Sequence, residues 1–397
     1  IHHLADAAEP ADVNGCWPSD DSCLVSVSWN HMGKCRGGAC SLGRGLPYGS
    51  PWVSGYERKG VRRLVRKKMG AVLGLALGAA FVLAGCGRPA EPVSRSGFLL
   101  NTFVTVTLYD TENENILDGC MELCREYEGL LSRTIETSEV YQINHRPAGT
   151  REMEVSGETA EVIEKGLYYS QLSGGAFDIT VEPLSSLWDF TAQEPQVPDG
   201  EEIRENLPKV GYERIAVSGD RILFSDDETR IDLGAIAKGY IADRMKDYLM
   251  EQGVESAIIN LGGNVLCLGK NPNGQPFRIG LQRPYAGYSE TVGTVRVENM
   301  SVVSSGVYER HFEKDGVNYH HILNPSTGYP YENGLTAVSI LSTQSVDGDG
   351  LSTACFSLGL EKGMELLDSL DNAWGVFITD DGQLHYSAGM EQWMMAE

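Results

Sequence analysis

The chain has 397 residues, enough for one large or two ordinary domains, and its hydrophobic content of 42% is ample for a buried core. The formal net charge of −23 excludes a nucleic-acid binder, because phosphate contacts need clustered lysine and arginine, which are scarce after residue 70. An acidic protein that handles a phosphorylated ligand needs a cation to screen the repulsion.

Residues 1–60 begin with Ile1, are rich in glycine, serine, tryptophan and cysteine, and have no sustained helical or strand period. A secretion signal is not expected to follow such a segment. We therefore expect residues 1–60 to be an unstructured upstream extension, with synthesis beginning at Val61 or Met69.

Residues 61–86 have the layout of a signal peptide, since a basic run is followed by an uncharged stretch that ends at Cys86. The last four residues, Leu-Ala-Gly-Cys, resemble the lipobox of bacterial lipoproteins. This predicts lipidation of Cys86 and an extracytoplasmic protein anchored to the bacterial membrane. The alternative is a single uncleaved transmembrane helix, for which the apolar run is barely long enough. Residues 87–97 are predicted to form a polar linker.

The body that follows mixes predicted strands and helices. Alternating β-branched and apolar residues predict a strand over 98–109, and helical spacing of apolar residues predicts helices over 113–131 and 158–173. A loop over 174–180 leads into a short extended piece. Short strands around Ile215, Ile222 and Ile231 precede a helix over 234–252. Further strands are predicted over 256–260, 264–268, 277–281, 293–297, 302–305 and 335–341, and a last helix over 345–358. The pattern predicts an α+β fold with mostly antiparallel sheets and flanking helices.

The nine cysteines form no convincing zinc pattern. Cys120 and Cys124 are four residues apart on a predicted helix, but no second pair accompanies them. We therefore interpret them as partly buried thiols rather than as metal ligands.

The segment 231–243 is the richest in candidate chemistry. Small residues open its predicted helix after Asp232, so free backbone amides at the helix start would attract an anion, and Lys238 one turn later could add a point charge. The alternative is that Asp232 only caps the helix and that Lys238 is a solvated side chain.

A second segment, 347–353, lies at the start of the last predicted helix. Asp349 and Thr353 are four residues apart, which places a carboxylate and a hydroxyl on one helix face. Hard oxygen ligands of this kind suit Mg²⁺. The alternative is an acidic helix start that only complements the helix dipole.

A third segment, 320–330, carries two histidines and the turn signals Asn-Pro and Thr-Gly. His320 and His321 would point to opposite faces of a strand, so at most one can reach a given site. The glycine pairs at 174–175 and 262–263 would let backbone approach a flat ligand, or they are plain turns.

The order of these segments resembles that of the ApbE-type FAD:protein FMN transferases. The most specific part is 232–239, Asp-Leu-Gly-Ala-Ile-Ala-Lys-Gly. Similar segments are 101–103, 131–132, 138–139 with Asn144, 177–180, 260–264, 305–310, 321–330 and 349–353. The resemblance covers residues 98–390 and implies one flavin transferase domain over that range.

The resemblance also implies FAD as the substrate and Mg²⁺ as the cofactor. It assigns Mg²⁺ to the Ala235 carbonyl, Asp349 and Thr353. It assigns FAD contacts to Leu100, Ala176, Phe177, Asp178, Asp232, Lys238 and Leu323. The chain departs from the family where Leu100-Asn101 replaces the usual Met-Gly, where Thr134 replaces a frequent aromatic residue, and where Asn324 replaces a frequent aspartate.

The implied activity is Mg²⁺-dependent transfer of FMN from FAD to a threonine or serine hydroxyl of a target protein, with release of AMP. Asp349 or His321 would serve as the catalytic base, and spacing does not choose between them. The implied target is a membrane redox subunit with an FMN-binding domain. Two alternatives are a FAD pyrophosphatase that releases FMN and AMP, and a flavin-binding lipoprotein without catalysis.

Overall fold

The computed structural model describes residues 24–26, 91–190, 192–287 and 290–396, which all belong to one compact unit. The predicted signal peptide, including Cys86, lies outside the described residues, as does most of the predicted extension 1–60. Within the described ranges, no helix combines the length and the apolar character needed to cross a membrane.

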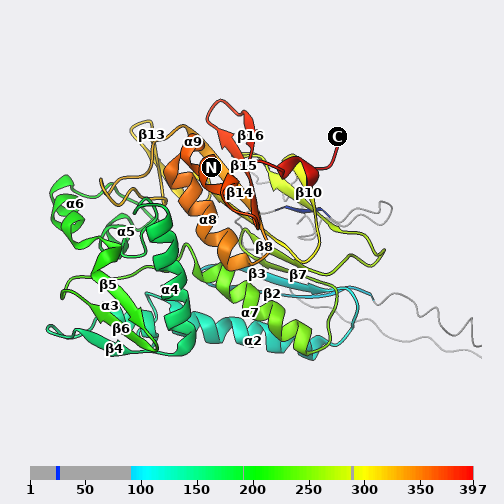
Figure 1. The fold of residues 1–397 in the computed structure, drawn as a ribbon, viewed down its shortest axis with the longest axis horizontal. Coiled ribbons are helices and arrows are strands. Elements are labelled where there is room, and N and C mark those ends of the chain that lie inside the picture. The colour runs from blue at the N-terminus through cyan, green and yellow to red at the C-terminus, as the bar shows by residue number, and fades with distance from the viewer. Residues whose placement is uncertain (1–23, 27–90, 191, 288–289, 397) are drawn as a thin grey trace, which may run out of the picture. The chain divides into compact units, whose positions relative to one another are not determined.

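An eight-stranded antiparallel sheet forms the centre of the unit (Figure 1). Both of its faces are covered, and β14 is therefore buried along its whole length. Along β8 the side chains alternate, so that Leu266 joins the core on one face while Val265 and Cys267 join the core on the other. The strand order is β16 (Leu384–Tyr386), β15 (Ala373–Thr379), β14 (Leu335–Ser342), β11 (Ser301–Gly306), β8 (Asn264–Leu268), β7 (Ala257–Leu261), β3 (Thr102–Leu108) and β2 (Val93–Leu99).

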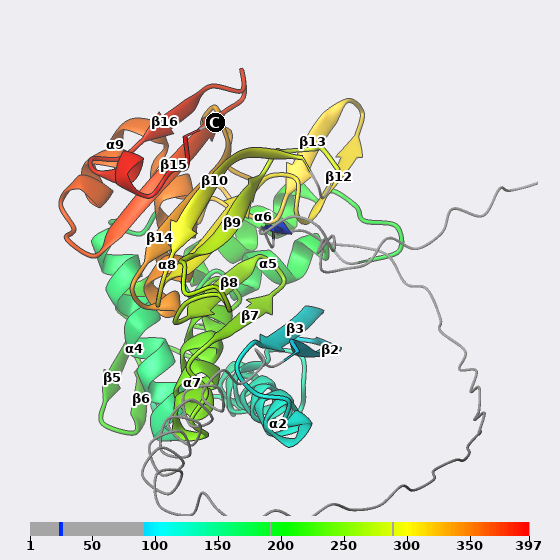
Figure 2. The ribbon, with the colours of Figure 1, turned by 90° about the vertical axis from the view of Figure 1, so that its right-hand side faces the viewer.

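Four helices cover one face of this sheet (Figures 1 and 2). The helix α2 (Glu114–Leu131) is capped by Asn113 and buries one apolar face against β2, β3 and α7 (Ala237–Glu251). The helix α8 (Ser345–Leu358) is buried on almost all sides, because it lies between the sheet, α7 and α4 (Gly157–Leu172). The fourth helix, α9 (Leu360–Asp368), packs on β15.

A three-stranded sheet covers the opposite face. It consists of β10 (Thr291–Val297), β9 (Phe277–Gln282) and β1 (Leu24–Ser26), and apolar side chains of β9 and β10 share a second core with the main sheet. The 3-10 turn η3 (Met390–Gln392) adds Met390 to this core. The strand β1 corrects one expectation, because it lies within the extension predicted to be unstructured; its backbone pairs in parallel with the edge of β9.

A smaller lobe, built mainly from residues 132–231, adjoins the helical face. Its core joins α4 to a three-stranded sheet of order β4-β6-β5. The ribbon β12 (His311–Lys314) and β13 (Val317–His320) packs its aromatic side chains on the α5 part of the lobe. The elements of the lobe are α3 (Glu139–Asn144), β4 (Glu152–Glu154), α4 (Gly157–Leu172), α5 (Glu182–Trp188), α6 (Gly200–Asn206), η1 (Leu207–Lys209), η2 (Tyr212–Arg214), β5 (Ile215–Ser218) and β6 (Arg221–Phe224).

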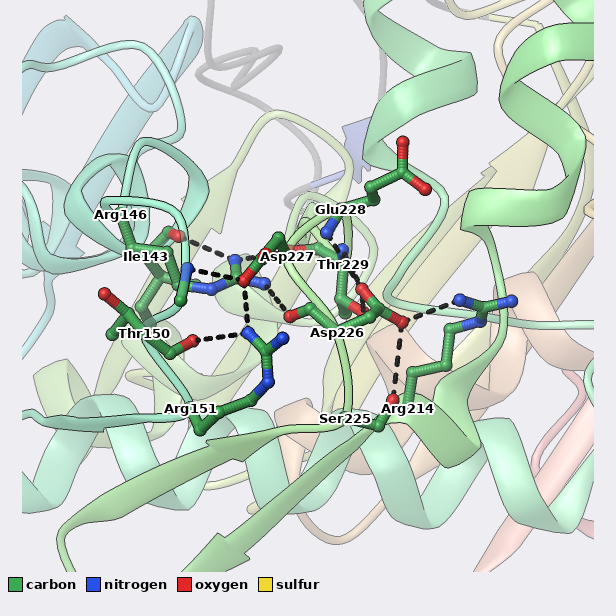
Figure 3. A network of polar contacts seen from close by, with 11 residues as sticks. Ile143, Arg146, Thr150, Arg151, Arg214, Ser225, Asp226, Asp227, Glu228 and Thr229 are labelled. Carbon is green, nitrogen blue, oxygen red and sulfur yellow. Dashed lines mark hydrogen bonds and ion pairs between the residues drawn. The ribbon is translucent and has the colours of Figure 1, made fainter.

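An arginine network holds the chain that leaves β6 (Figure 3). Arg146 donates hydrogen bonds to the carbonyls of Asp226 at 3.1 Å and Thr229 at 2.5 Å, and its guanidinium lies 3.8 Å from the centre of the Phe224 ring. Asn144 then pairs with both backbone groups of Ile231, at 2.8 and 2.7 Å. These contacts fix the segment that leads into Asp232.

The structure confirms the predicted α+β class and most long elements. The helix predicted over 345–358 has the bounds of α8, and that predicted over 113–131 is α2 within one residue. The four described cysteines, Cys120, Cys124, Cys267 and Cys355, are free and buried.

Several expectations were wrong. The range 87–97 is not all linker, because β2 begins at Val93, and the single strand predicted over 98–109 is instead part of a β2–β3 hairpin. Ile231 lies outside any strand, and α7 begins at Ala237 rather than at residue 234. Residues 174–180 form turns that lead into α5, not into an extended piece.

Candidate active site

The candidate site lies where α7 meets α8. A Cβ atom added at Gly239 would lie 2.3 Å from the Ser345 carbonyl oxygen, so the two helices touch backbone to backbone. The Asp243 carboxylate accepts hydrogen bonds from the Ser345 and Val346 amides, both at 2.9 Å, and satisfies the first turn of α8. Burial raises the pKa of Asp243 to about 6. The start of α8 is therefore held firmly on α7.

Asp349 makes the reciprocal contact from α8 to α7. Its side chain is 4% exposed, and one carboxylate oxygen accepts a hydrogen bond from the Gly239 amide at 2.9 Å. The other oxygen lies 3.4 Å from the Lys238 ammonium, which also donates to the Gly234 carbonyl at 3.3 Å. The structure thus brings together Asp349 and Lys238, two residues singled out from distant parts of the sequence.

The Ala235 carbonyl is left open by this arrangement. In a continuous helix the Gly239 amide would donate to the carbonyl four residues earlier, which is that of Ala235. Here the same amide donates to Asp349 instead. No other hydrogen bond to the Ala235 carbonyl is found among the described residues. Its oxygen is therefore available to a ligand.

Thr353 completes the set of oxygen groups. It lies one turn after Asp349 on α8, and its hydroxyl oxygen is 3.3 Å from that of Ser305 on β11. A carboxylate, a carbonyl and a hydroxyl are hard oxygen ligands of the kind that suits Mg²⁺. The Lys238 ammonium is a positive group beside Asp349. Within the described ranges no group of three or more His, Cys, Asp or Glu side chains could hold a metal ion, so a cation here would depend on this mixed set.

A second acidic residue of α8 fixes α4 beside it. The Asp347 carboxylate accepts a hydrogen bond from the Tyr169 hydroxyl at 2.7 Å and pairs with Lys165 at 3.2 Å. The Tyr169 ring also packs against the bare backbone of Gly350, where an added Cβ would lie 2.4 Å from it. Because α4 leads into the loop that carries Ala176, Phe177 and Asp178, this contact sets that loop relative to Asp349.

Hydrogen bonds with neighbouring residues fix the loop from Ala176 to Asp178. Ser173 accepts from the Phe177 amide at 2.9 Å, and the Ala176 carbonyl accepts from the Tyr331 hydroxyl at 2.9 Å. Both Asp178 oxygens are occupied, one by Thr180 and the other by the Tyr212 amide at 3.0 Å. Burial raises the pKa of Asp178. In this structure Asp178 therefore organises the loop.

A cavity of about 290 Å³ opens beside this loop. Ala176 is one of its lining residues, together with Asn324, Ser326 and Tyr331 from the 320–331 segment and Lys362 from α9. The cavity thus joins two of the segments to which FAD contacts were assigned.

Leu100 lies elsewhere, on the tight turn between β2 and β3. Leu100 and Asn101 both have left-handed backbone, with φ of 54° and 55°, a conformation that is unusual for leucine. The Leu100 amide donates to the Glu128 carboxylate at 2.8 Å, which holds the turn on α2. The neighbouring Gly262 turn packs so closely that an added Cβ would lie 1.7 Å from the Thr102 hydroxyl. Strain at a turn of this kind is a common property of ligand-binding positions.

The two histidines occupy different settings. His320 ends β13, is buried, and its ring contacts the Tyr331 carbonyl at 2.9 Å. The His321 ring has a buried Nδ1 atom without a hydrogen-bond partner in the part of the chain that the structure describes. Burial and the nearby charge of Arg310 lower the pKa of His321 well below its usual range, so its ring is neutral at physiological pH. Leu323 is buried in the apolar cluster around Trp188.

Asp232 lies in a cluster that the sequence did not indicate. Its carboxylate accepts from the Gly234 amide at 2.9 Å and from the Ser185 hydroxyl at 2.9 Å, and it pairs with Arg133 at 3.2 Å. Arg133 also lies 4.0 Å from Glu182.

Three residues of this region were missed by the sequence reasoning. Arg133 follows α2 and Glu182 is the first residue of α5. Neither belongs to a periodic pattern, so nothing in the sequence indicates a role for them. Glu309 lies within a segment that carries the family resemblance, but no role was assigned to it. Burial raises the pKa of Glu309 to about 7, although the charges of Lys238 and Arg310 oppose the shift.

Comparisons with known proteins agree with the resemblance. The chain matches the ApbE family over residues 100–378. A FAD:protein FMN transferase of Klebsiella pneumoniae (strain 342) is 37% identical over 297 residues, which cover 74% of this chain and 92% of the relative. One from Treponema pallidum (strain Nichols) is 31% identical over 78% of this chain and 91% of the relative.

Solved structures agree as well. The flavin transferase ApbE from Vibrio cholerae superposes with a TM-score of 0.70 at 28% identity, covering 77% of this chain and 100% of the other. The ApbE protein of Thermotoga maritima gives a TM-score of 0.71 at 30% identity, with the same coverage. These matches extend over most of the chain and include the segments singled out in the sequence. They show that the chain belongs to the ApbE family.

Proposed function

We propose that this ApbE-family chain, a FAD:protein FMN transferase, uses Mg²⁺ to move FMN from FAD onto a threonine or serine hydroxyl of a target protein. The observation that carries the Mg²⁺ proposal is the Ala235 carbonyl just before α7, which accepts no hydrogen bond among the described residues. Four residues later, the free Gly239 amide at the start of α7 donates to Asp349 at 2.9 Å.

Ala235, Asp349 and Thr353 would hold the cation. When bound, Mg²⁺ would supply positive charge to the diphosphate of FAD. Lys238 adds a further positive group on the same side, since its ammonium lies 3.4 Å from Asp349. These two sources of positive charge would let FAD approach a protein whose net charge is −23.

The proposed reaction exchanges one phosphorus–oxygen bond for another. The target hydroxyl oxygen attacks the phosphorus atom of the FMN half, and the bond from that atom to the bridging oxygen breaks. AMP leaves with the bridging oxygen, and FMN remains joined to the target side chain as a phosphoester. The hydroxyl proton passes to a base of the protein.

His321 is the better candidate for that base. Its ring is neutral because burial and Arg310 lower its pKa, and its Nδ1 atom has no hydrogen-bond partner among the described residues. Asp349 is less suited, because Gly239 and Lys238 already occupy its two oxygens.

The Asp349→Asn variant tests the proposal. Purified protein is mixed with FAD, MgCl₂ and an FMN-binding domain of a membrane redox subunit, and AMP and covalent flavin are measured. We expect the variant to lose activity about a hundredfold or more, since the asparagine amide cannot supply the anionic ligand. The matched control is Asp371→Asn, which changes an exposed aspartate in the same way.

Three outcomes separate the possible functions. Covalent flavin on the acceptor together with AMP supports transfer. Free FMN and AMP, with no labelled acceptor, would instead establish a FAD pyrophosphatase. Retained FAD with no AMP would indicate a flavin-binding protein without catalysis. Equal activity of Asp349→Asn and wild type would contradict the proposed cation site.

We further propose that the enzyme acts outside the cytoplasm, anchored to the membrane through lipid on Cys86, where a membrane redox subunit would be within reach. The support is the signal-peptide layout of residues 61–86. In cells, Cys86→Ser should move the protein from the membrane to the soluble fraction. A variant that remains in the membrane fraction would contradict the anchor.

A further inference from the structure

A group of polar side chains beside Asp232 links three parts of the chain. Arg133, which follows α2, pairs with Asp232 at 3.2 Å and donates to the Ser186 hydroxyl at 2.8 Å. Ser186 in turn donates to Glu182 at 2.6 Å, within the short helix α5. Ser185, on the same helix, donates to Asp232 at 2.9 Å. Glu182 and Asp232 are therefore held side by side by one arginine and two serines.

These contacts leave one carboxylate oxygen of Glu182 without a hydrogen bond. The residue is only 8% exposed, and its second carboxylate oxygen, Oε2, is buried without a hydrogen-bond partner among the described residues. The guanidinium of Arg133 does not supply the missing bond, because its distance of 4.0 Å to Glu182 is too long and is measured to the other oxygen. A buried carboxylate oxygen without a donor is costly, and such groups call for an explanation.

The chemistry of FAD limits which of its groups could contact the unpaired oxygen of Glu182. An ionised carboxylate is only an acceptor, so its missing partner must be a donor. The diphosphate of FAD carries negative charge and offers no donor, so Glu182 would repel it. The hydroxyl groups of the sugar and the N–H groups of the rings are the donors that FAD does possess.

We propose that Glu182 is a specificity residue of the dinucleotide site, which accepts a hydrogen bond through Oε2 from the adenosine 2′-hydroxyl, the adenine amino group or the flavin N3–H of FAD. The inference rests on the proposed function and on the FAD contact that the family resemblance assigns to Asp232. Arg133 acts as a positioning residue, because it balances the charge of Asp232 and holds Glu182 through Ser186. Its side chain is 32% exposed, so it can adjust when the dinucleotide enters.

Binding measurements with modified dinucleotides test this inference. Wild type and Glu182→Gln are titrated, in MgCl₂ and without acceptor, with FAD and with three analogues. The analogues carry 2′-deoxyribose in the adenosine, unsubstituted purine in place of adenine, or a methylated flavin N3, and each lacks one donor group. Glu205→Gln, at an exposed position of α6, is the matched control.

We expect wild type to bind one of the three analogues about tenfold to a hundredfold more weakly than FAD. Glu182→Gln should discriminate less between FAD and that same analogue, because its neutral amide oxygen is a weaker acceptor than the carboxylate. The analogue concerned identifies the group that Glu182 contacts. If Glu182→Gln discriminates all three analogues as wild type does, Glu182 has only a structural role and the inference is wrong.

A second variant covers the case in which Glu182→Gln does not fold, as judged by thermal melting. Ser186→Ala keeps the carboxylate but removes the group that holds it, so it should weaken the same discrimination; an unchanged ratio would overturn the inference. The titrations require no turnover. If wild-type protein binds FAD but transfers no FMN to an acceptor, the proposed function is contradicted. The comparison of FAD with its analogues can still be interpreted in that case.

Discussion

His321 shows how the setting of one residue determines its chemistry. Its neighbour His320 has the same side chain but lies at the end of β13 with its ring on the Tyr331 carbonyl. The sequence predicted that only one of the two histidines could reach a given site. The family resemblance pointed to His321, whereas the physical difference between the two rings depends on the Arg310 charge and on burial, both of which arise from the fold.

The lowered pKa of His321 has a consequence for stability. The folded protein keeps the ring neutral, whereas the unfolded chain binds a proton below a pKa of about 6.5. The contribution of His321 to stability is therefore complete above that pH and is lost as the pH falls below it. Between pH 6.5 and 5.5 we expect the free energy of unfolding of wild type to fall. That of His321→Asn should fall by about 1 kcal/mol less over the same range.

Urea unfolding at several pH values measures this difference. His311→Asn, at an exposed histidine of β12, serves as the control substitution. Identical pH profiles for His321→Asn and wild type would contradict the neutral, buried state of this ring.

Elements were predictable where their own sequence determines them. The amphipathic α2 appears with nearly the predicted bounds, because apolar residues at helical spacing mark it, and α8 also has the predicted bounds. The short helices α3, α5 and α6 were missed, since six or seven residues carry too little periodicity and depend on tertiary contacts.

The sequence also placed Asp349 and Lys238 in one functional group, but only through the family resemblance. Their actual contact depends on the approach of α7 to α8, which no local pattern reveals. The missing side chain of Gly239 permits that approach.

Gly239→Ala should therefore separate the two helices. The added methyl group would overlap the Ser345 carbonyl at 2.3 Å, and the overlap involves backbone that cannot rotate away. We expect a loss of stability of about 1–3 kcal/mol and weakened Mg²⁺ binding, measured by urea unfolding and by calorimetric titration. Gly129→Ala is the matched control, because nothing lies within 4 Å of its added methyl group in α2, and it should raise stability by up to about 1 kcal/mol. Equal effects of the two substitutions would refute the close contact.

The link between α4 and α8 gives a second prediction at this scale. Tyr169→Phe removes the hydroxyl that donates to Asp347 at 2.7 Å, so a buried carboxylate loses one of its two partners. We expect the free energy of unfolding to fall by about 1.5–3 kcal/mol, the usual range for a hydrogen bond to a charged group. Tyr168→Phe makes the same change at a half-exposed neighbour and should cost less than about 0.5 kcal/mol. If Tyr169→Phe is as stable as wild type, Asp347 does not fix α4 as described.

The whole molecule combines an acidic body with a few buried or half-buried positive groups. Lys238, Arg310 and Arg133 all lie near Asp232 or Asp349, while the chain carries 55 acidic residues against 32 basic ones. The net charge alone predicted that a phosphorylated substrate would need a cation. The family resemblance proposed Ala235, Asp349 and Thr353 as its ligands, and the fold adds that Asp349 and Thr353 lie on α8, with Asp349 bonded to the start of α7.

We propose that a divalent cation at this site allows FAD to be split and its FMN half to be transferred. The most direct measurement is the intact mass of an FMN-binding acceptor domain after incubation with this protein and FAD, with MgCl₂ or with EDTA. We predict that the acceptor gains the mass of one esterified FMN with MgCl₂ and gains nothing with EDTA. Equal labelling in EDTA, or none under either condition while FAD stays intact, would contradict the account.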